Sequence, residues 1–211
     1  STQVLSLDGA SCSIVQNADT FGEKLLVVQG TTALELHFDK IANKLVAIKY
    51  MTALDMVRTK SYATSWKYIG QLPPRTVSAL SESDTLRRDQ GHSDQLFDMT
   101  NIYRQINQLN VLSRCSFSDR VALSHSKDMA VGQFVSHVSA KTGTLKQRYS
   151  AAPYKMSFIS ENIAYGSFDA IEAMMSWINS PGHRSNLLSP KATKLGIGSY
   201  LQYYTQNFTQ Y

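Results

Sequence analysis

The stretch ENIAYGSFDAIEAMMSWINSPGHRSNLL, residues 161–188, carries the strongest structural signals of this chain. Its large apolar residues recur at intervals of three and four, which is the spacing of one helical face; they are Ile171, Met174 and Ile178, with Trp177 beside them. The spacing predicts a helix that begins after Ser167 and has Asp169 in its first turn, where a negative charge is favourable.

The end of that stretch predicts a corner. Pro181 and Gly182 end the helix, because proline removes a backbone donor and glycine favours turns. HRSNLL (183–188) is long enough for one more helical turn before Ser189-Pro190 stops it. Arg184 and Asn186 carry donors suited to the carbonyl groups at such helix ends. A structural corner is therefore the first interpretation of this segment, and a role for His183 in a binding cleft is the second.

Two more helices are expected upstream. From Ser93 onward one apolar face repeats over about 18 residues; its members are Leu96, Met99, Tyr103, Ile106 and Leu109. Ser118 is a plausible N-cap of a second helix, with Asp119 in its first turn. That helix keeps Val121, His125, Met129, Gly132 and Val135 in register, so His125 is interpreted as a core histidine.

The first third of the chain favours β-strands. GEKLLVVQG is a short apolar run, TALELHFD places Leu34, Leu36 and Phe38 on one face, and KLVAIKYM alternates again after a turn at DKIANK. A β-hairpin is expected there, and another strand is expected near Trp66–Ile69. The prolines of QLPPR and the polar SALSESD that follows predict a boundary at about residues 72–90. The expected helices and strands do not alternate as βαβ units, which indicates the α+β class.

The composition and charge of the chain limit the kinds of partner that it could bind. The 211 residues are 43% hydrophobic and carry a net charge of +5, which suits an anionic cell wall or membrane surface and is weak as a nucleic-acid signal. Residues 129–160 contain no acidic side chain but contain Lys141, Lys146, Arg148 and Lys155. This basic segment is either a solvated loop or a docking patch for polyanions. No run of apolar residues is long enough to span a membrane.

The fold is not expected to depend on disulfide bonds, because the chain has only two cysteines, Cys12 and Cys115, and they lie far apart in sequence. We expect unpaired thiols. The chain begins at Ser1 without a methionine, so any targeting or anchoring segment would lie outside it.

Five motifs, in order, resemble the CAP superfamily of cysteine-rich secretory, antigen 5 and pathogenesis-related-1 proteins, in particular its bacterial SCP-like extracellular branch. They are NIYRQIN, HSKDMA, ENIAYG, WINSPGHRSNLL, and the pair LGIGSY and YYTQNF. The resemblance covers about residues 92–211 and implies an α-β-α sandwich with a cleft on one side. Residues 1–78 resemble, on domain order and strand content, the accessory domain that precedes some bacterial CAP domains. The expected organisation is therefore 1–78, a linker at 79–91, and 92–211.

The resemblance also implies a cleft with two histidines and two glutamates. His137, expected near the end of the second helix, and Glu161 match the first histidine and the first glutamate. Ser180 stands at the position of the second glutamate, and Tyr203 at that of the second histidine. A catalytic zinc needs about three protein ligands, and His183 is the only third candidate. No cofactor is therefore expected.

Three functions remain open at this stage. The first is a non-enzymatic extracellular or cell-surface module that binds cell-wall polymer, lipid or protein through the cleft, without nucleic acid. The second is a hydrolase, perhaps a peptidase, that uses His137 and Glu161, with or without His183 and a metal. The third is a small-lipid carrier, which requires an apolar groove of a few hundred Å³. For His137 and Glu161 themselves, a purely structural pair is the alternative to a functional one.

Overall fold

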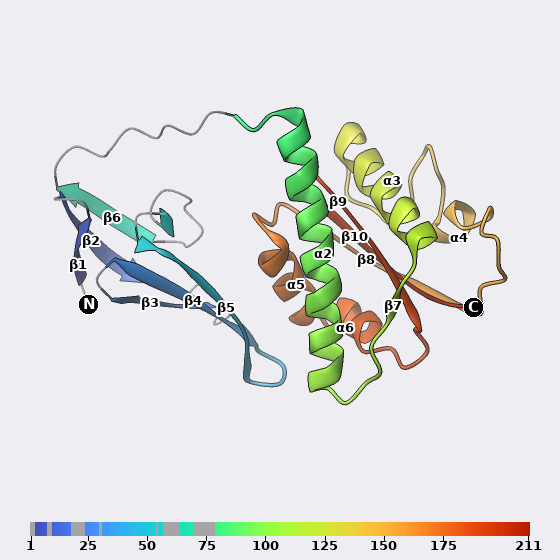
Figure 1. The fold of residues 1–211 in the computed structure, drawn as a ribbon, viewed down its shortest axis with the longest axis horizontal. Coiled ribbons are helices and arrows are strands. Elements are labelled where there is room, and N and C mark those ends of the chain that lie inside the picture. The colour runs from blue at the N-terminus through green and yellow to red at the C-terminus, as the bar shows by residue number, and fades with distance from the viewer. Residues whose placement is uncertain are drawn as a thin grey trace. The chain divides into compact units, whose positions relative to one another are not determined.

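The computed structural model describes residues 3–7, 10–17, 24–29, 31–53, 55–56, 64–69 and 79–211. The chain divides into two compact units, Ser1–Ser78 and Ala79–Tyr211, each with its own sheets (Figure 1). Among the described residues, every helix is too short or too polar to cross a bilayer.

The described part of the first unit contains two antiparallel three-stranded sheets. One has the order β1-β2-β6, formed by β1 (Gln3–Leu7), β2 (Ala10–Asn17) and β6 (Thr64–Ile69). The other has the order β3-β4-β5, formed by β3 (Lys24–Gln29), β4 (Thr32–Asp39) and β5 (Lys44–Thr52). The predicted strands and the hairpin turn after Asp39 are confirmed, whereas the β1–β2 pair was not predicted.

The second unit is built on a four-stranded sheet of order β7-β9-β10-β8, antiparallel except for the short β7–β9 pair. Its strands are β7 (Ser113–Arg114), β8 (Phe158–Tyr165), β9 (Lys194–Tyr200) and β10 (Tyr203–Gln210). Its helices are α2 (Glu82–Ile106), α3 (Ser116–Gly132), α4 (Leu145–Arg148), α5 (Ala170–Ile178) and α6 (Pro181–Leu187).

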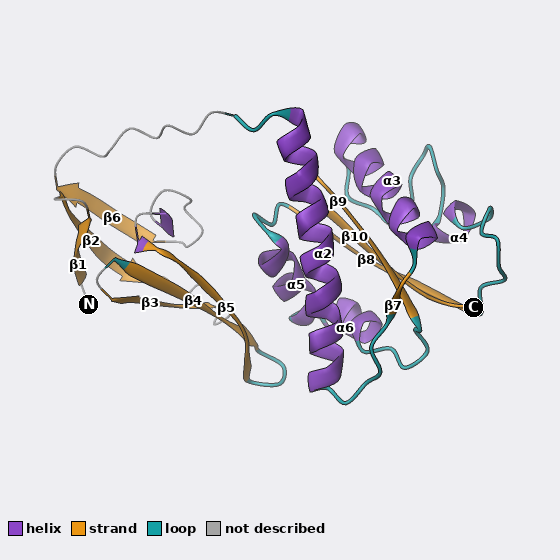
Figure 2. Ribbon diagram, viewed as in Figure 1, coloured by secondary structure: helices purple, strands orange, loops and turns teal. Residues whose placement is uncertain are grey.

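Helices cover both faces of this sheet, as the resemblance implied (Figure 2). Alternate β10 side chains reach opposite layers: Thr205 bonds Ser126 of α3 at 2.8 Å, whereas Gln206 donates to Thr100 of α2 at 2.7 Å. Helix α3 lies directly on β9, because a Cβ added at Gly198 would stand 2.0 Å from a backbone atom of Leu123. The second unit is therefore an α-β-α sandwich of the α+β class.

The first helix begins earlier than predicted. Ser81 is its N-cap and accepts a hydrogen bond from the Asp84 N–H at 3.1 Å, so residues 82–91 are helical rather than a linker. The apolar spacing did not predict these first turns, because the residues that point to the protein interior there are polar. Asp89 is buried and accepts the Leu201 N–H at 2.9 Å, and buried Ser93 bonds Ser199 at 3.1 Å.

Other element ends show smaller differences. Helix α3 begins at Ser116 with Cys115 as N-cap, so Ser118 is a buried first-turn residue and not the cap. It ends at Gly132, because Gln133 adopts a left-handed φ of 52°, and His137 therefore lies beyond the helix. Asp169, expected in the first turn of α5, is instead its N-cap. Pro181 and Gly182, expected to end that helix, form the start of α6, which therefore begins two residues before the predicted turn at 183–188.

Candidate functional site

The candidate site centres on Glu161 of β8. The strand register places Glu161 opposite Asn207 of β10, and only 2% of its side chain is exposed. Its Oε1 accepts a hydrogen bond from His137 Nδ1 at 2.9 Å, and its Oε2 accepts one from Arg148 Nη2 at 2.5 Å. Both carboxylate oxygens are therefore engaged by cationic or potentially cationic groups.

His137 is the accessible member of this pair, with 53% of its side chain exposed. Its Nδ1 faces Glu161, which leaves Nε2 as the ring nitrogen for an approaching ligand. The segment that carries it is fastened to α3 by Asp128, which accepts hydrogen bonds from Ser139 and Thr142. A second fastening comes from Arg148, whose Nη1 donates to the His137 carbonyl at 3.0 Å. The imidazole is thus held in one orientation while it remains open to solvent.

Arg148 is the site residue that sequence analysis missed. Its side chain is only 4% exposed, and it donates to the Gly143 carbonyl at 3.1 Å in addition to Glu161 and His137. It was counted in the basic segment, but its charge is directed inward and is neutralised there. A signal did exist: a buried carboxylate requires a cation, and Arg148 is the only arginine in residues 129–160.

His125 of α3 lies beneath the pair. It is fully buried, as predicted for a core histidine, and its Nε2 donates to the Ser136 carbonyl at 2.9 Å. The same Nε2 lies 3.9 Å from Glu161 Oε1. Burial lowers the pKa of His125, although the Glu161 charge opposes that change. The folded state therefore favours the neutral form of His125 near pH 7.

His183, the proposed third cleft residue, does not complete a metal site. It lies in α6, and its backbone carbonyl accepts a hydrogen bond from Asn162 Nδ2 at 3.1 Å. Burial lowers the pKa of His183, and the nearby His137 lowers it further. In the described part of the chain, no three histidine, cysteine, aspartate or glutamate side chains gather so that they could hold a metal ion.

The GHRSN corner has a structural role at this site. Asn186 donates to the Glu161 carbonyl at 3.1 Å and to Asn162 Oδ1 at 2.9 Å, and Arg184 donates to the Ile178 carbonyl at 3.3 Å. The corner therefore fixes the backbone of β8 at Glu161, and the first of its two interpretations describes Arg184 and Asn186 correctly.

The structure also places the two positions at which the resemblance implied a second glutamate and a second histidine, Ser180 and Tyr203. Ser180 is the N-cap of α6, with no side-chain capping bond. Tyr203 packs in a cluster with Met129 and Ile163, and its ring lies 4.3 Å from that of Tyr165, centroid to centroid. Tyr203 is only 8% exposed. It therefore serves packing more than it serves ligand contact.

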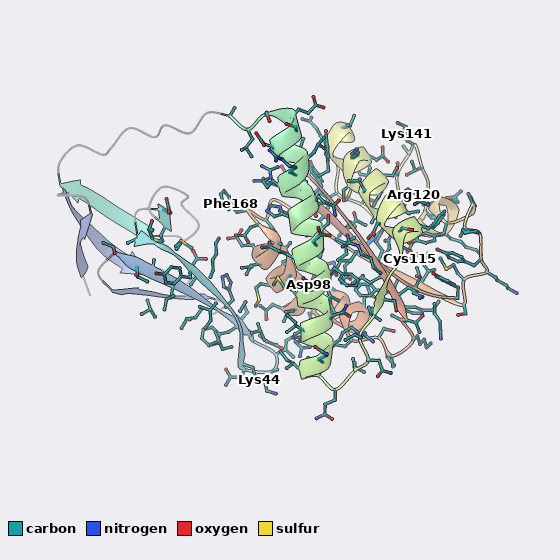
Figure 3. All side chains as sticks on the ribbon, viewed as in Figure 1. Lys44, Asp98, Cys115, Arg120, Lys141 and Phe168 are labelled. Atoms are coloured by element: carbon teal, nitrogen blue, oxygen red, sulfur yellow. The ribbon has the colours of Figure 1, made fainter. Side chains whose placement is uncertain are left out.

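A groove next to this site has a volume of about 310 Å³. It lies between α3 and the segment that leads to α4; its lining residues are Phe117, Arg120, Val121, Ser124, Thr142, Arg148 and Ala151. Arg120 of this groove and the nearby exposed Lys141 are labelled in Figure 3. The groove thus combines apolar walls with positive charge.

The family comparison agrees with this architecture. Residues 97–211 match the model of the cysteine-rich secretory protein family, CAP, and the chain belongs to this family. The uncharacterized membrane protein YlbC of Bacillus subtilis is 35% identical over 181 residues, which is 85% of this chain and 51% of that protein. The uncharacterized protein YkwD of the same species is 29% identical over 107 residues, which is 51% of this chain and 42% of that protein. The chain therefore spans about half the length of the curated relatives that it matches.

Solved bacterial structures are also similar. An extracellular protein containing a SCP domain from Bacillus anthracis has a TM-score of 0.85 and 31% identity, and the match covers all of this chain and 67% of that one. A cysteine-rich secretory protein from Staphylococcus aureus has a TM-score of 0.74 and 18% identity, with the same coverage. The first match shows the bacterial SCP-like relationship, and the second shows the fold.

Proposed function

We propose that this protein is an extracellular or cell-surface binding module without enzymatic activity, and that its ligand is an anionic cell-wall polymer. The observation that carries this proposal is the state of Glu161, both of whose carboxylate oxygens accept hydrogen bonds from His137 and Arg148. A carboxylate neutralised by a buried arginine is a weak general base and a poor metal ligand. What remains accessible is the oriented imidazole of His137.

Charge around the site supports an anionic ligand. Lys141 and Lys146 are exposed, no acidic side chain occurs in residues 129–160, and Arg120 borders the neighbouring groove. Such a one-signed surface attracts polyanions and raises their local concentration. The extracellular location is proposed because the similar Bacillus anthracis protein is described as extracellular; YlbC, described as a membrane protein, is compatible with the cell surface.

Cosedimentation with purified Gram-positive cell walls tests the binding. We expect wild-type protein to sediment with walls, and Lys141→Glu and His137→Ala to weaken that binding several-fold at low salt. Lys191→Glu is the matched control, because Lys191 is an exposed lysine outside residues 129–160. Equal binding by all four proteins, or no binding by the wild type, would refute the proposal.

Calorimetry tests the hydrolase alternative. At pH 7 we expect no zinc site of nanomolar affinity. A catalytic zinc requires about three protein ligands, and His137 and Glu161 supply only two. A one-to-one site that His137→Ala abolishes would instead establish a metal centre. Hydrolysis of a peptide library by the wild type, lost in Glu161→Gln, would likewise replace the binding proposal with an enzymatic one.

One observation favours small-lipid carriage as a second candidate. A groove of about 540 Å³ lies beside α4, and Tyr149, Tyr154, Met156 and Ile159 form its apolar wall. This volume agrees with the few hundred Å³ expected for the groove of a small-lipid carrier. Retention of a fluorescent fatty acid, reduced by Met156→Asp and unaffected by His137→Ala, would support this candidate.

A further inference from the structure

The first unit presents an unusual apolar surface on the β3-β4-β5 sheet. Cross-strand partners share one face of a sheet, and the register pairs Leu34 with Tyr50, Leu36 with Ile48, and Phe38 with Leu45. We call these six side chains the apolar face. Its β5 members are strongly exposed, Tyr50 at 72% and Ile48 at 56%. Val27 of β3 lies opposite Leu34 and is exposed as well.

The opposite face of β4 is buried and, apart from Ala33, carries polar side chains. Glu35 and His37 are fully buried, with Glu35 Oε2 and His37 Nε2 3.4 Å apart, and Asp39 is also buried. An antiparallel sheet with one solvated face normally buries its apolar side and exposes its polar side. Here three polar side chains lie on the buried side of β4, whereas large apolar side chains lie on the exposed side of β5. A sheet face with large exposed apolar residues indicates an interaction surface.

The charge at one end of this face specifies the partner. The β4–β5 turn carries Lys40 and Lys44 on either side of Ile41, which is 53% exposed, and Lys44 is labelled in Figure 3. The only acidic residue of the turn, Asp39, is buried and accepts the backbone N–H groups of Ile41 and Ala42 at 3.0 and 2.9 Å. The tip therefore presents positive and apolar groups together.

We propose that the apolar face and its lysine-bearing tip dock on the surface of an anionic phospholipid membrane. Leu45, Ile48 and Tyr50 would enter the boundary between headgroups and acyl chains, where tyrosine keeps its ring in the apolar layer and its hydroxyl in water. Lys44 would lie at the phosphates and strengthen attachment to an anionic leaflet. A second copy of the chain is a less favourable occupant, because each copy carries the same net charge of +5. This inference is independent of the cleft.

Vesicle cosedimentation of the full chain provides the test. We expect binding to vesicles that mix phosphatidylglycerol with phosphatidylcholine, weaker binding at high salt, and little binding to phosphatidylcholine alone. Tyr50→Asp and Ile48→Asp should each lower the partition coefficient at least tenfold. Lys44→Glu should lower it about tenfold, because each lysine near an anionic surface contributes about 1 kcal/mol and the reversal adds repulsion.

Matched controls separate this surface from general charge and hydrophobicity. Val131→Asp changes an 82% exposed apolar residue of the second unit, and Lys191→Glu changes an exposed lysine there; both should bind vesicles like the wild type. All variants should keep the wild-type melting temperature, because the altered side chains are exposed. The proposal would be overturned if the Tyr50→Asp variant bound vesicles like the wild type, or if the wild type did not bind anionic vesicles. A concentration-dependent dimer that Tyr50→Asp dissociates would instead assign the face to self-association.

Discussion

At the scale of single residues, one carboxylate organises the candidate site, and its two partners differ. Glu161 meets Arg148, whose side chain is 4% exposed, and His137, whose side chain is 53% exposed. A buried charge pair is costly to break because the remaining charge has no compensation. A half-exposed contact is screened by water and contributes little. We therefore assign the structural role to the Arg148–Glu161 pair, whereas His137 is the partner that the proposed ligand would contact.

This division makes a prediction about stability. Glu161→Ala and Arg148→Ala should each lower the free energy of unfolding by about 3–5 kcal/mol, because each strands a buried partner. Glu161→Gln should cost less, since it keeps an acceptor. His137→Ala should cost under about 1 kcal/mol. Urea denaturation of the single and double variants gives the coupling energies.

The outcome distinguishes two interpretations of the site. A large coupling between Glu161 and Arg148, with a small one between Glu161 and His137, supports the assignment above. Neutral or stabilising single variants at all three positions would contradict it, because residues kept for function at the expense of stability behave in that way.

At the scale of elements, a buried arginine joins α2 to the end of α6. Arg104 is 1% exposed and donates to the carbonyls of Asn110, Leu187 and Ser189 at 2.9, 2.8 and 3.0 Å. Burial lowers the pKa of Arg104. These bonds satisfy carbonyl groups where the corner ends. The corner that positions Glu161 thus depends on a helix about eighty residues earlier in the chain.

We predict that Arg104→Ala destabilises the protein by about 3 kcal/mol or more, because three carbonyls, one of them fully buried, lose a charged donor and a large buried side chain is removed. Arg104→Lys should rescue only part of this loss, since an ammonium group cannot reproduce the planar fork of donors. Arg87→Ala, at an 80% exposed side chain of the same helix, is the control and should change stability by less than about 0.5 kcal/mol. The denaturant midpoint measures all three, and an Arg104→Ala midpoint equal to that of Arg87→Ala would disprove the role.

At the scale of the whole molecule, the chain forms two units, and the second begins where α2 is capped. Ser81 accepts the Asp84 N–H, and the early turns of α2 reach the end of β9 through Asp89 and Ser93. A fragment that begins at residue 92 would omit the contact between Asp89 and the Leu201 N–H. The first turns of α2 are therefore part of the core of the second unit.

We predict that residues 79–211 fold alone with one cooperative thermal transition, close to that of the corresponding unit in the full chain. Residues 92–211 should melt several degrees lower, because the hydrogen bond to Asp89 and nearly three helical turns are lost. Calorimetry of both fragments and the full chain is the measurement. A broad, non-cooperative melt of 79–211 would show that the first unit is needed for folding.

Much of the second unit could be predicted from sequence because its signals are local. The apolar spacing predicted α5, the Ser-Pro and Pro-Gly pairs indicated the short helix α6 to within two residues, and the motif series indicated the CAP fold that the comparison confirms. The same signals failed where inward positions are polar. Buried Asp89 lies in the turns of α2 that were not predicted, because a search for apolar spacing does not detect a buried carboxylate.

The sequence by itself indicated most of the helices and strands, and it showed that two of the four residues expected from the resemblance are replaced. Only the tertiary structure decided what the remaining residues do. It brought Arg148 to Glu161, left His183 outside a metal-binding geometry, packed Tyr203 against Met129, and left the apolar side chains of β5 exposed. The physical reason is that helix and strand signals act over a few residues, whereas ion pairing and burial depend on contacts between residues distant in sequence.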